Sequence, residues 1–360
     1  MQTGMKLLVV GCGSIGRRHA RNARKLGLDV ALCDTSEERL SDLALEIGAV
    51  GVFTDYQVAV KEAGAEAGLI ATPSHLHLAP ASAMLAAGMH VMMEKPLCPS
   101  VAEAHALKSL VIESKRIFMM AHTFRFRAEW QAIKKLLDTQ PVGRVLSAEF
   151  LGGWYLPDWH FREDYRQEYA AQRRQGGGVM LTSMSHFIDV VSWFFGEIQG
   201  VVGAKMRLSS LDIDVDDAVM CTVKTTNGVA VTLCEDFLAR CPRRMFRING
   251  EHGYVEVDFN RKSLRLWDAR TKRHFPGDDP GKEKEGLFRI LEDGVGYDME
   301  PDNFPLEYSE NDAYLAEMEH FVGLVGRSCT DSELGIDAGI KVLEAIESAG
   351  IIDWTQTRMN

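Results

Sequence analysis

The chain has 360 residues, enough for two domains of ordinary size, each with its own hydrophobic core. Hydrophobic residues make up 46% and charged residues 25% of the chain, which are the proportions of a globular protein in water. The 51 acidic residues outnumber the 40 Lys and Arg residues, giving a formal charge of −11, and no basic patch with interleaved aromatic residues occurs. This composition argues against a protein that binds nucleic acid.

Neither a cleavable leader nor a membrane span is expected. The chain runs from Met1 straight into the first predicted strand, and no apolar stretch reaches the roughly 20 residues that a membrane-spanning helix needs. The seven cysteines contain no Cys-x-x-Cys pair and no spacing typical of metal ligands, so we expect no metal. A reducing cytoplasm is the simplest compartment for such a chain.

Over the first third of the chain, short apolar runs alternate with stretches of helical spacing. Strands alternating with helices predict right-handed crossovers and a doubly wound parallel sheet, the Rossmann arrangement. The predicted strands are residues 6–10, 30–33, 68–71, 90–93 and 117–121, and the predicted helices are residues 15–26, 37–47, 56–63, 79–87 and 101–114.

A glycine-rich turn follows the first predicted strand, and residues 11–16 read Gly-Cys-Gly-Ser-Ile-Gly. In a dinucleotide-binding turn the first glycine allows the tight bend, the second lets the backbone touch the pyrophosphate, and the third lets the helix pack closely. Asp34 follows the second strand, where an acid binds the adenosine ribose, so the pattern favours NAD over NADP. The residues assigned to the cofactor here are Gly11, Gly13, Ser14, Ile15, Gly16 and Asp34.

Two further segments follow predicted strands of the same sheet. Thr72 and Pro73 come after the strand at 68–71, and Glu94-Lys95-Pro96 comes after the strand at 90–93. The carboxyl ends of parallel strands meet at one edge of a sheet, so both segments are expected beside the glycine turn.

From about residue 145 the pattern changes to β-branched runs with a period of two. Asn227-Gly228 between two such runs predicts a hairpin, and the whole predicts a second α/β domain with an open, largely antiparallel sheet. The predicted strands are residues 145–151, 201–208, 218–225, 230–237, 245–248, 254–259 and 263–267. A helix is predicted at 180–195, an irregular loop at 277–310, and closing helices at 311–326 and 332–349.

Four of these segments together resemble one protein family. The segments Ala71–His77, Ala87–Pro96, Gly176–Asp189 and Tyr314–Phe321 are similar, in this order, to the family of glucose–fructose oxidoreductase, inositol dehydrogenase and MocA-like dehydrogenases. The resemblance implies a dinucleotide-binding domain over residues 1–124 and a substrate-binding and oligomerisation domain over 125–360. It also implies that the closing helices, at about 311–349, pack on the first domain, and that the second sheet joins subunits into a homodimer or homotetramer.

The resemblance implies two catalytic residues, Lys95 and His186. From the sequence alone, Lys95 could equally be an exposed loop lysine, and a histidine beside an apolar helix face is usually a core residue. The triple glycine at 176–178 supports a catalytic His186, because small residues would let a substrate approach the backbone. By resemblance Glu94 binds the nicotinamide ribose. Cofactor contacts are also expected from Thr72, Pro73, His77 and Lys95.

One position departs from the family pattern. The family has an aspartate four positions before its histidine, where this chain has Thr182. Threonine brings no negative charge, so a protonated His186 is less favoured. Asp189, one helical turn away, could compensate, as could Asp158 or Asp164.

The aromatic and polar run Trp154–His160 suits a carbohydrate, whose apolar face stacks on rings while acids hold its hydroxyl groups; it could equally anchor a loop. His122 and Arg125 follow the strand at 117–121 and either line the cleft between the domains or are linker residues without a ligand. The residues assigned to the substrate are His122, Arg125, Tyr155, Asp158, Thr182 and Asp189.

These observations predict an NAD(P)-dependent oxidoreductase that transfers a hydride between a nicotinamide cofactor and a secondary alcohol of a sugar, cyclitol or sugar derivative. Two alternatives remain open. The chain could be a dinucleotide-binding sensor without catalysis, which Thr182 favours and the intact Glu94-Lys95 and His186 oppose. It could also be an NAD-assisted glycosidase that oxidises its substrate transiently.

Overall fold

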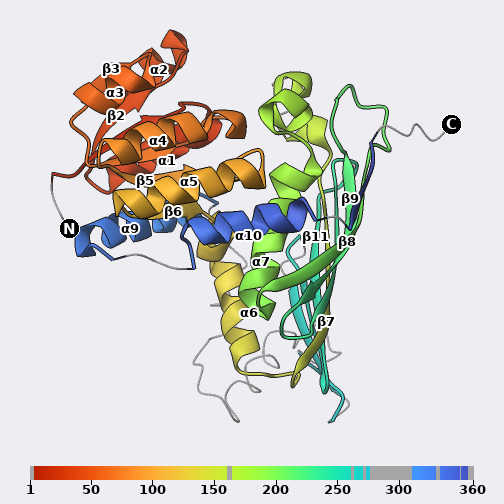
Figure 1. Ribbon diagram of the computed structural model, residues 1–360. Helices are drawn as coiled ribbons and strands as arrows, with labels where there is room; N and C mark the ends of the chain where they lie inside the picture. Colours follow the sequence, from red (N-terminus) through yellow and green to blue (C-terminus); the bar gives the residue numbers. More distant parts are fainter. Residues whose placement is uncertain are drawn as a thin grey trace. The chain divides into compact units, whose positions relative to one another are not determined.

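The computed structural model describes residues 4–159, 164–260, 263–270, 273–275, 310–329, 333–348 and 350–355 (Figure 1). Its internal contacts divide the chain into two compact units. Unit 1 comprises Met1–Phe126, Arg174–Gly176 and Ser309–Glu347, and unit 2 comprises Arg127–Arg173, Gly177–Tyr308 and Ser348–Asn360. The loop predicted at 277–310 lies outside the described residues except for Glu310, where helix α9 begins.

Unit 1 is built on a six-stranded sheet of order β3-β2-β1-β4-β5-β6 in which every pairing is parallel. The predicted Rossmann sheet is confirmed, and it has an additional edge strand, β3. That strand has only three residues, none of them fully buried, so it carried no recognisable apolar run. The strands are β1 Lys6–Val10, β2 Asp29–Cys33, β3 Gly51–Phe53, β4 Ala67–Ile70, β5 His90–Glu94 and β6 Phe118–Ala121.

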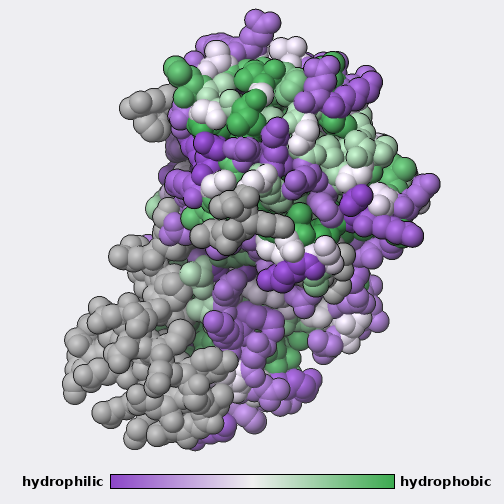
Figure 2. Space-filling view, turned by 90° about the vertical axis from the view of Figure 1, so that its left-hand side faces the viewer, coloured by the Kyte–Doolittle hydropathy of each residue, from purple (hydrophilic) through white to green (hydrophobic). Residues whose placement is uncertain are grey.

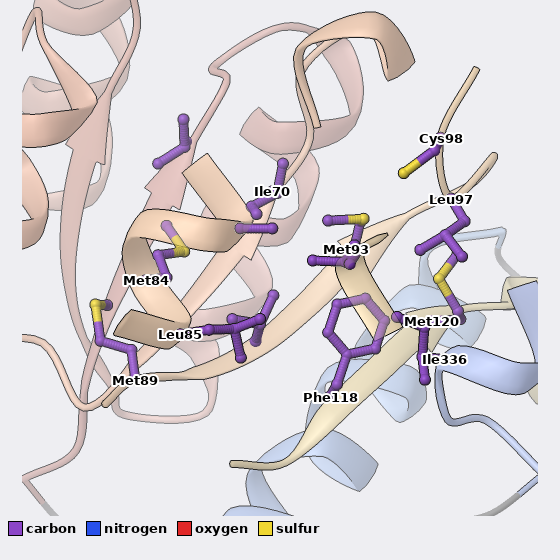
Figure 3. Packing of buried hydrophobic residues seen from close by; sticks show 14 of the residues in the cluster. Ile70, Met84, Leu85, Met89, Met93, Leu97, Cys98, Phe118, Met120 and Ile336 are labelled. Carbon is purple, nitrogen blue, oxygen red and sulfur yellow. The ribbon is translucent and has the colours of Figure 1, made fainter. Parts of the chain in front are cut away.

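Helices cover both faces of this sheet, and successive residues of β1 face opposite layers. Leu7 and Val9 pack in a cluster with residues of α1, α2 and α9, whereas Leu8 and Val10 pack in a cluster with residues of α4, α5 and α10. Figure 3 shows Ile336 of α10 beside Phe118 and Met120 in the second cluster. The helices are α1 Ser14–Lys25, α2 Glu37–Ile47, α3 Tyr56–Glu62, α4 Leu78–Ala86, α5 Val101–Ser114, α9 Glu310–Arg327 and α10 Ile336–Ile346.

Unit 2 contains a nine-stranded sheet of order β14-β13-β12-β11-β7-β10-β9-β8-β15, in which β7–β10 and β8–β15 are parallel and the other pairs antiparallel. The predicted hairpin joins β9 and β10, with Gly228 at a φ of 80°. Sequence reasoning missed the short strands β14 and β15. The strands are β7 Val145–Gly153, β8 Ile198–Met206, β9 Ala218–Thr225, β10 Ala230–Asp236, β11 Arg243–Gly250, β12 Gly253–Asp258, β13 Ser263–Asp268, β14 Arg273–Phe275 and β15 Ile351–Trp354.

Aromatic side chains from two helices form the core on one face of this sheet. Trp130 of α6 (Ala128–Asp138) and Phe187 of α7 (Ser185–Phe195) both pack on Phe150 of β7, with ring centroids 5.8 Å and 3.7 Å away. Helix α6 was not predicted, although Trp130, Ile133 and Leu137 have helical spacing. The predicted helix at 180–195 begins as a π-helix, η7, at Met180–Met184 before it continues as α7.

The segment Arg173–Phe195 is long and apolar enough to cross a membrane, but 67% of its most apolar window is buried inside the protein, as in a core helix. On the face shown in Figure 2, hydrophilic residues are interspersed with hydrophobic ones.

Candidate functional site

The glycine turn has the geometry that a dinucleotide-binding turn requires. Gly11 has a φ of 95°, and a Cβ there would lie 2.6 Å from the carbonyl oxygen of Ala71. A Cβ on Gly16 would lie 1.8 Å from the carbonyl oxygen of Gly11, so the start of α1 packs directly on the turn. A Cβ on Gly13, by contrast, would have no atom within 4 Å. The protein itself therefore requires glycine at positions 11 and 16 but not at position 13, where the open space suits a phosphate group.

Asp34 fixes the conformation of this turn from the end of β2. Its Oδ2 accepts a hydrogen bond from the backbone N–H of Cys12 at 2.7 Å, and its Oδ1 accepts one from the N–H of Ser36 at 2.9 Å. The guanidinium of Arg39 is 3.9 Å from Oδ2. The carboxylate is thus oriented before any cofactor binds.

Two hydroxyl groups after β4 point to a polar ligand at the same edge of the sheet. Thr72 Oγ1 and Ser74 Oγ are buried, and neither has a hydrogen-bond partner among the residues that the structure describes. Buried polar groups in proteins nearly always have partners, so these two fit a site completed by a bound group. Together with the space beside Gly13, they satisfy the requirements of a dinucleotide.

His77 connects the two loops that follow β4 and β5. Its Nε2 is 2.8 Å from the carbonyl oxygen of Thr72 and its Nδ1 is 3.2 Å from that of Leu97. The ring is only 1% exposed, and this burial lowers the pKa of His77 below its ordinary value despite the hydrogen bonds. We infer that His77 fixes the spacing of these loops; direct contact with the cofactor stays a prediction.

Glu94 and Lys95 lie at the carboxyl end of β5. Glu94 Oε1 is 2.9 Å from Nε2 of His19 on α1, and Oε2 accepts a hydrogen bond from the backbone N–H of Lys95 at 3.2 Å. Burial alone would raise the pKa of Glu94, but the hydrogen bond and charge of His19 and the charge of Lys95 outweigh it and lower this pKa. A carboxylate that stays ionised is suited to bind ribose hydroxyl groups.

Sequence reasoning missed His19, which joins helix α1 to the Glu94-Lys95 loop. The imidazole is fully buried, and it makes a T-shaped contact with the ring of Tyr314, with centroids 5.4 Å apart. A usable signal was present, because the buried residues Gly16, His19, Ala20 and Ala23 lie on one face of α1. A polar residue on that inward face needs a polar partner.

In unit 2, Asp216 holds the start of the segment that carries His186. Its carboxylate accepts a hydrogen bond from the N–H of Met180 at 2.8 Å, and its carbonyl accepts one from the N–H of Val179 at 3.1 Å. Burial raises the pKa of Asp216 to about 6, although the hydrogen bond from Met180 acts in the opposite direction. His186 follows in the first turn of α7 and is half-buried.

The interpretation of the triple glycine was wrong. A Cβ on Gly176 would lie 2.3 Å from Ser74 Oγ, one on Gly177 would lie 2.4 Å from the carbonyl oxygen of Tyr169, and one on Gly178 would lie 2.4 Å from Asp216 Oδ1. Atoms of the protein fill the space beside each glycine. The three glycines are therefore required by packing, and they do not by themselves indicate a substrate.

The structure also defines the surroundings of the acids that could replace the missing aspartate. Thr182 is buried and donates its hydroxyl hydrogen to the carbonyl of Gly178 at 2.6 Å. Asp164 is bound by two nitrogens of the Arg166 guanidinium, each at 2.8 Å, and so is engaged elsewhere. Asp158 is exposed, whereas Asp189 is 2% exposed within α7. Among the described residues, no three His, Cys, Asp or Glu side chains are grouped so that they could hold a metal ion.

The remaining substrate candidates lie in both units. In unit 1, Arg125 is 3.7 Å from Glu333, and His122 is only 3% exposed. In unit 2, the guanidinium of Arg240 stacks on the ring of Tyr155 at 3.6 Å. Lys95 belongs to unit 1 and His186 to unit 2, and their action at a common reacting centre stays a prediction.

Comparison with known families agrees with this geometry. The model of an oxidoreductase family with an NAD-binding Rossmann fold, GFO/IDH/MocA, matches residues 5–122, and the model of the GFO/IDH/MocA C-terminal domain matches residues 130–256. The chain belongs to the GFO/IDH/MocA family. This family is one of oxidoreductases with an NAD-binding Rossmann fold, and the family predicted from the four sequence segments is confirmed.

Among curated relatives, levoglucosan dehydrogenase of Pseudarthrobacter phenanthrenivorans is 24% identical over 80% of this chain and 84% of its own length. UDP-N-acetylglucosamine 3-dehydrogenase of Acidithiobacillus ferrooxidans is 26% identical over 83% and 87%. The solved structure of levoglucosan dehydrogenase in complex with NADH has a TM-score of 0.77 at 20% identity and covers 95% of each chain. This last similarity establishes the shared fold.

Proposed function

We propose that this protein is an NAD-dependent dehydrogenase that interconverts a secondary alcohol and a ketone on a sugar, a cyclitol or a sugar derivative. The observation that carries the proposal is the pairing of the glycine turn with the Glu94-Lys95 loop at one edge of the unit 1 sheet, connected through the 2.9 Å contact between His19 and Glu94. The curated relatives support the substrate class, because both are named for carbohydrates.

Oxidation of an alcohol needs a base for the hydroxyl proton and a positive group that stabilises the oxygen as negative charge develops. NAD, when bound, supplies the ring that accepts the hydride. We assign Lys95 to the reacting oxygen, because an ammonium group stabilises that charge, and His186 to the proton. Thr182 adds no negative charge beside His186, so this histidine is expected to be a weaker proton acceptor than one paired with an aspartate.

The test is to mix the purified protein with NAD or NADP and a panel of levoglucosan, myo-inositol, D-glucose and UDP-N-acetylglucosamine. We expect the near-ultraviolet absorbance of NADH to rise with at least one compound, and NAD to be preferred, because Asp34 repels the extra phosphate of NADP. An absence of reduction with every compound and both cofactors would contradict the proposed activity. A preference for NADP would contradict only the assignment of Asp34.

A second candidate function is a regulator that binds the dinucleotide without turning over a substrate. It is favoured by Thr182, whose hydroxyl group donates to the carbonyl of Gly178 and supplies no charge to His186. In that case NAD binds tightly but none of the panel is oxidised, and replacing Lys95 changes no measured property of the protein.

We also propose that the open face of the unit 2 sheet joins copies of this chain. Four large apolar side chains on three neighbouring strands are exposed there: Val202 is 62%, Met220 50%, Ile352 53% and Trp354 44% exposed. Apolar residues gathered on one face of a sheet are typical of a subunit interface.

The double variant Met220→Lys, Ile352→Lys is expected to shift the protein from an oligomer to a monomer, as measured by light scattering after size-exclusion chromatography. Two buried charges in the interface would prevent association. The matched control is Leu45→Lys, since Leu45 is 88% exposed on α2 and its replacement should leave the mass unchanged. A monomeric starting protein, or an unchanged oligomer in the double variant, contradicts this interface.

A further inference from the structure

Three neighbouring strands of unit 2 place an acid, a glycine and an arginine side by side. Gly152 of β7 pairs with Arg244 of β11, and Leu151 pairs with Cys234 of β10, so Glu235 follows beside Gly152. The residues that precede this row on the same face are Phe150, Leu233 and Phe246, which are all fully buried. The row therefore lies where the apolar core of the sheet ends.

Gly152 makes room for the carboxyl group of Glu235. A Cβ at position 152 would lie 1.7 Å from Glu235 Oε2, so no residue other than glycine leaves the acid in this place. Glu235 is only 8% exposed, and its Oε2 has no hydrogen-bond partner within the described residues. A buried carboxyl group that lacks a partner is unfavourable, so a group beyond the described residues is needed to complete its hydrogen bonding.

The positive charges near Glu235 do not offset the effect of burial on its pKa. Burial raises the pKa of Glu235 to about 8; Asp236 raises it further, whereas the charges of Arg244 and Arg243 act in the opposite direction. Arg243 lies 3.1 Å from Asp236, and Arg244 also lowers the pKa of a second buried acid, Glu129. Both arginines are therefore shared with other carboxylates, and the raised pKa favours the protonated form of Glu235.

The row lies near two segments that carry residues assigned to the substrate from the sequence, Thr182 and Tyr155. Ala218 pairs with Asp236, and Asp216, just before β9, binds Met180, so η7 with Thr182 begins at this end of β10. The N–H of Trp154 donates to the carbonyl of Asp236, which brings the aromatic run with Tyr155 to the same end. Glu235 immediately precedes Asp236, the residue that pairs with Ala218 and binds Trp154, and so lies at the end of β10 that both segments approach.

We propose that Glu235 is a substrate-binding residue whose carboxyl group hydrogen-bonds a hydroxyl group of a polyol, in the row formed with Gly152 and Arg244. This assignment rests on the proposed function and names a specificity residue for it. A protonated carboxyl group donates one hydrogen bond and accepts others, as a hydroxyl group does, so the two can pair in both directions. A site built to hydrogen-bond a hydroxyl group rejects an analogue that lacks this group, because the buried carboxyl group is then left without a partner.

The experiment records infrared spectra of the full-length protein with NADH. The difference between the unmodified protein and Glu235→Gln identifies the carbonyl band of the protonated Glu235. We expect this band at neutral pH, and we expect levoglucosan, myo-inositol or D-glucose to move it to lower frequency. Glu129→Gln is the matched control, because Glu129 is a buried acid already bound to Arg127 at 2.6 Å. Any band assigned to Glu129 should not respond to the polyols.

A second variant, Glu235→Met, removes the hydrogen bond and keeps the volume. For an alcohol that the enzyme oxidises, we expect KM to rise about tenfold with little change in kcat. A band absent at neutral pH, a band that none of the three polyols moves, or an unchanged KM would each overturn the assignment. If the protein oxidises an alcohol but the band does not move, the proposed function stands and only the assignment of Glu235 fails. If the band moves but no alcohol is oxidised, Glu235 binds the polyol and the proposed dehydrogenase activity is wrong.

Discussion

Replacing Lys95 by methionine is expected to lower kcat/KM for alcohol oxidation by about 10³-fold, a much larger change than any in NAD binding or thermal stability. The ammonium group is assigned to the reacting oxygen, where its charge matters most in the transition state. The partly exposed side chain is not part of either hydrophobic cluster of unit 1, so its removal leaves the core unchanged. Kinetics, NADH fluorescence titration and thermal melting measure the three quantities.

The matched control is Lys61→Met, the same change at an exposed position of α3 in the same unit, which should leave all three quantities unchanged. Loss of turnover in Lys95→Met together with loss of NAD binding would make Lys95 a cofactor-binding residue only. Retention of more than a tenth of the activity would remove it from the chemistry. If the unmodified protein binds NAD but oxidises nothing, and Lys95→Met behaves identically, the regulator is the correct function.

The features that sequence reasoning predicted are those encoded by neighbouring residues. The glycine turn, Asp34 and the Glu94-Lys95 loop each depend on a short motif placed after an apolar strand, and the parallel order of the strands then brings them to one edge. The geometry of the glycine turn follows from a backbone requirement that the residue type reveals: Gly11 has a φ of 95°, a conformation that favours glycine.

What sequence reasoning missed depends on the pairing of distant strands. Glu235 is adjacent to Gly152 only because β7 and β10 pair in one particular register, and Asp216 reaches Met180 only because the start of β9 lies next to η7. The triple glycine shows the same limit, because its neighbours Ser74, Tyr169 and Asp216 come from three separate segments. A run of glycines does not tell whether a ligand or the protein itself occupies the space beside it.

Alanine substitutions at Gly16 and Gly13 distinguish a glycine required by packing of the protein from one required by a ligand. We expect Gly16→Ala to act on the fold. In Gly16→Ala the new methyl group would lie 1.8 Å from the carbonyl oxygen of Gly11. Neither atom belongs to a flexible side chain, so α1 must move away from the turn. Overpacking of this kind lowers the free energy of unfolding by about 1–3 kcal/mol, and NAD binding is lost with it.

Gly13→Ala is expected to act on the cofactor alone. Gly13 has a φ of −68° and a ψ of −168°, which alanine adopts without strain, and its Cβ would meet no atom within 4 Å. The free energy of unfolding should therefore change by less than about 0.5 kcal/mol. The methyl group would occupy the space in which a pyrophosphate contacts the N-terminal end of α1, and we expect the dissociation constant of NADH to rise at least about tenfold. Thermal melting and fluorescence titration measure both effects.

The control for Gly13→Ala is Gly200→Ala in β8, another position where an added Cβ meets nothing within 4 Å, and neither stability nor NADH affinity should change there. Gly13→Ala with unchanged affinity would mean that the pyrophosphate lies elsewhere than at the turn, whatever the glycine spacing. A loss of stability equal to that of Gly16→Ala would instead mean that position 13 is constrained by the protein. The expected result, full stability with weakened binding, occurs only if a ligand is the reason for the glycine.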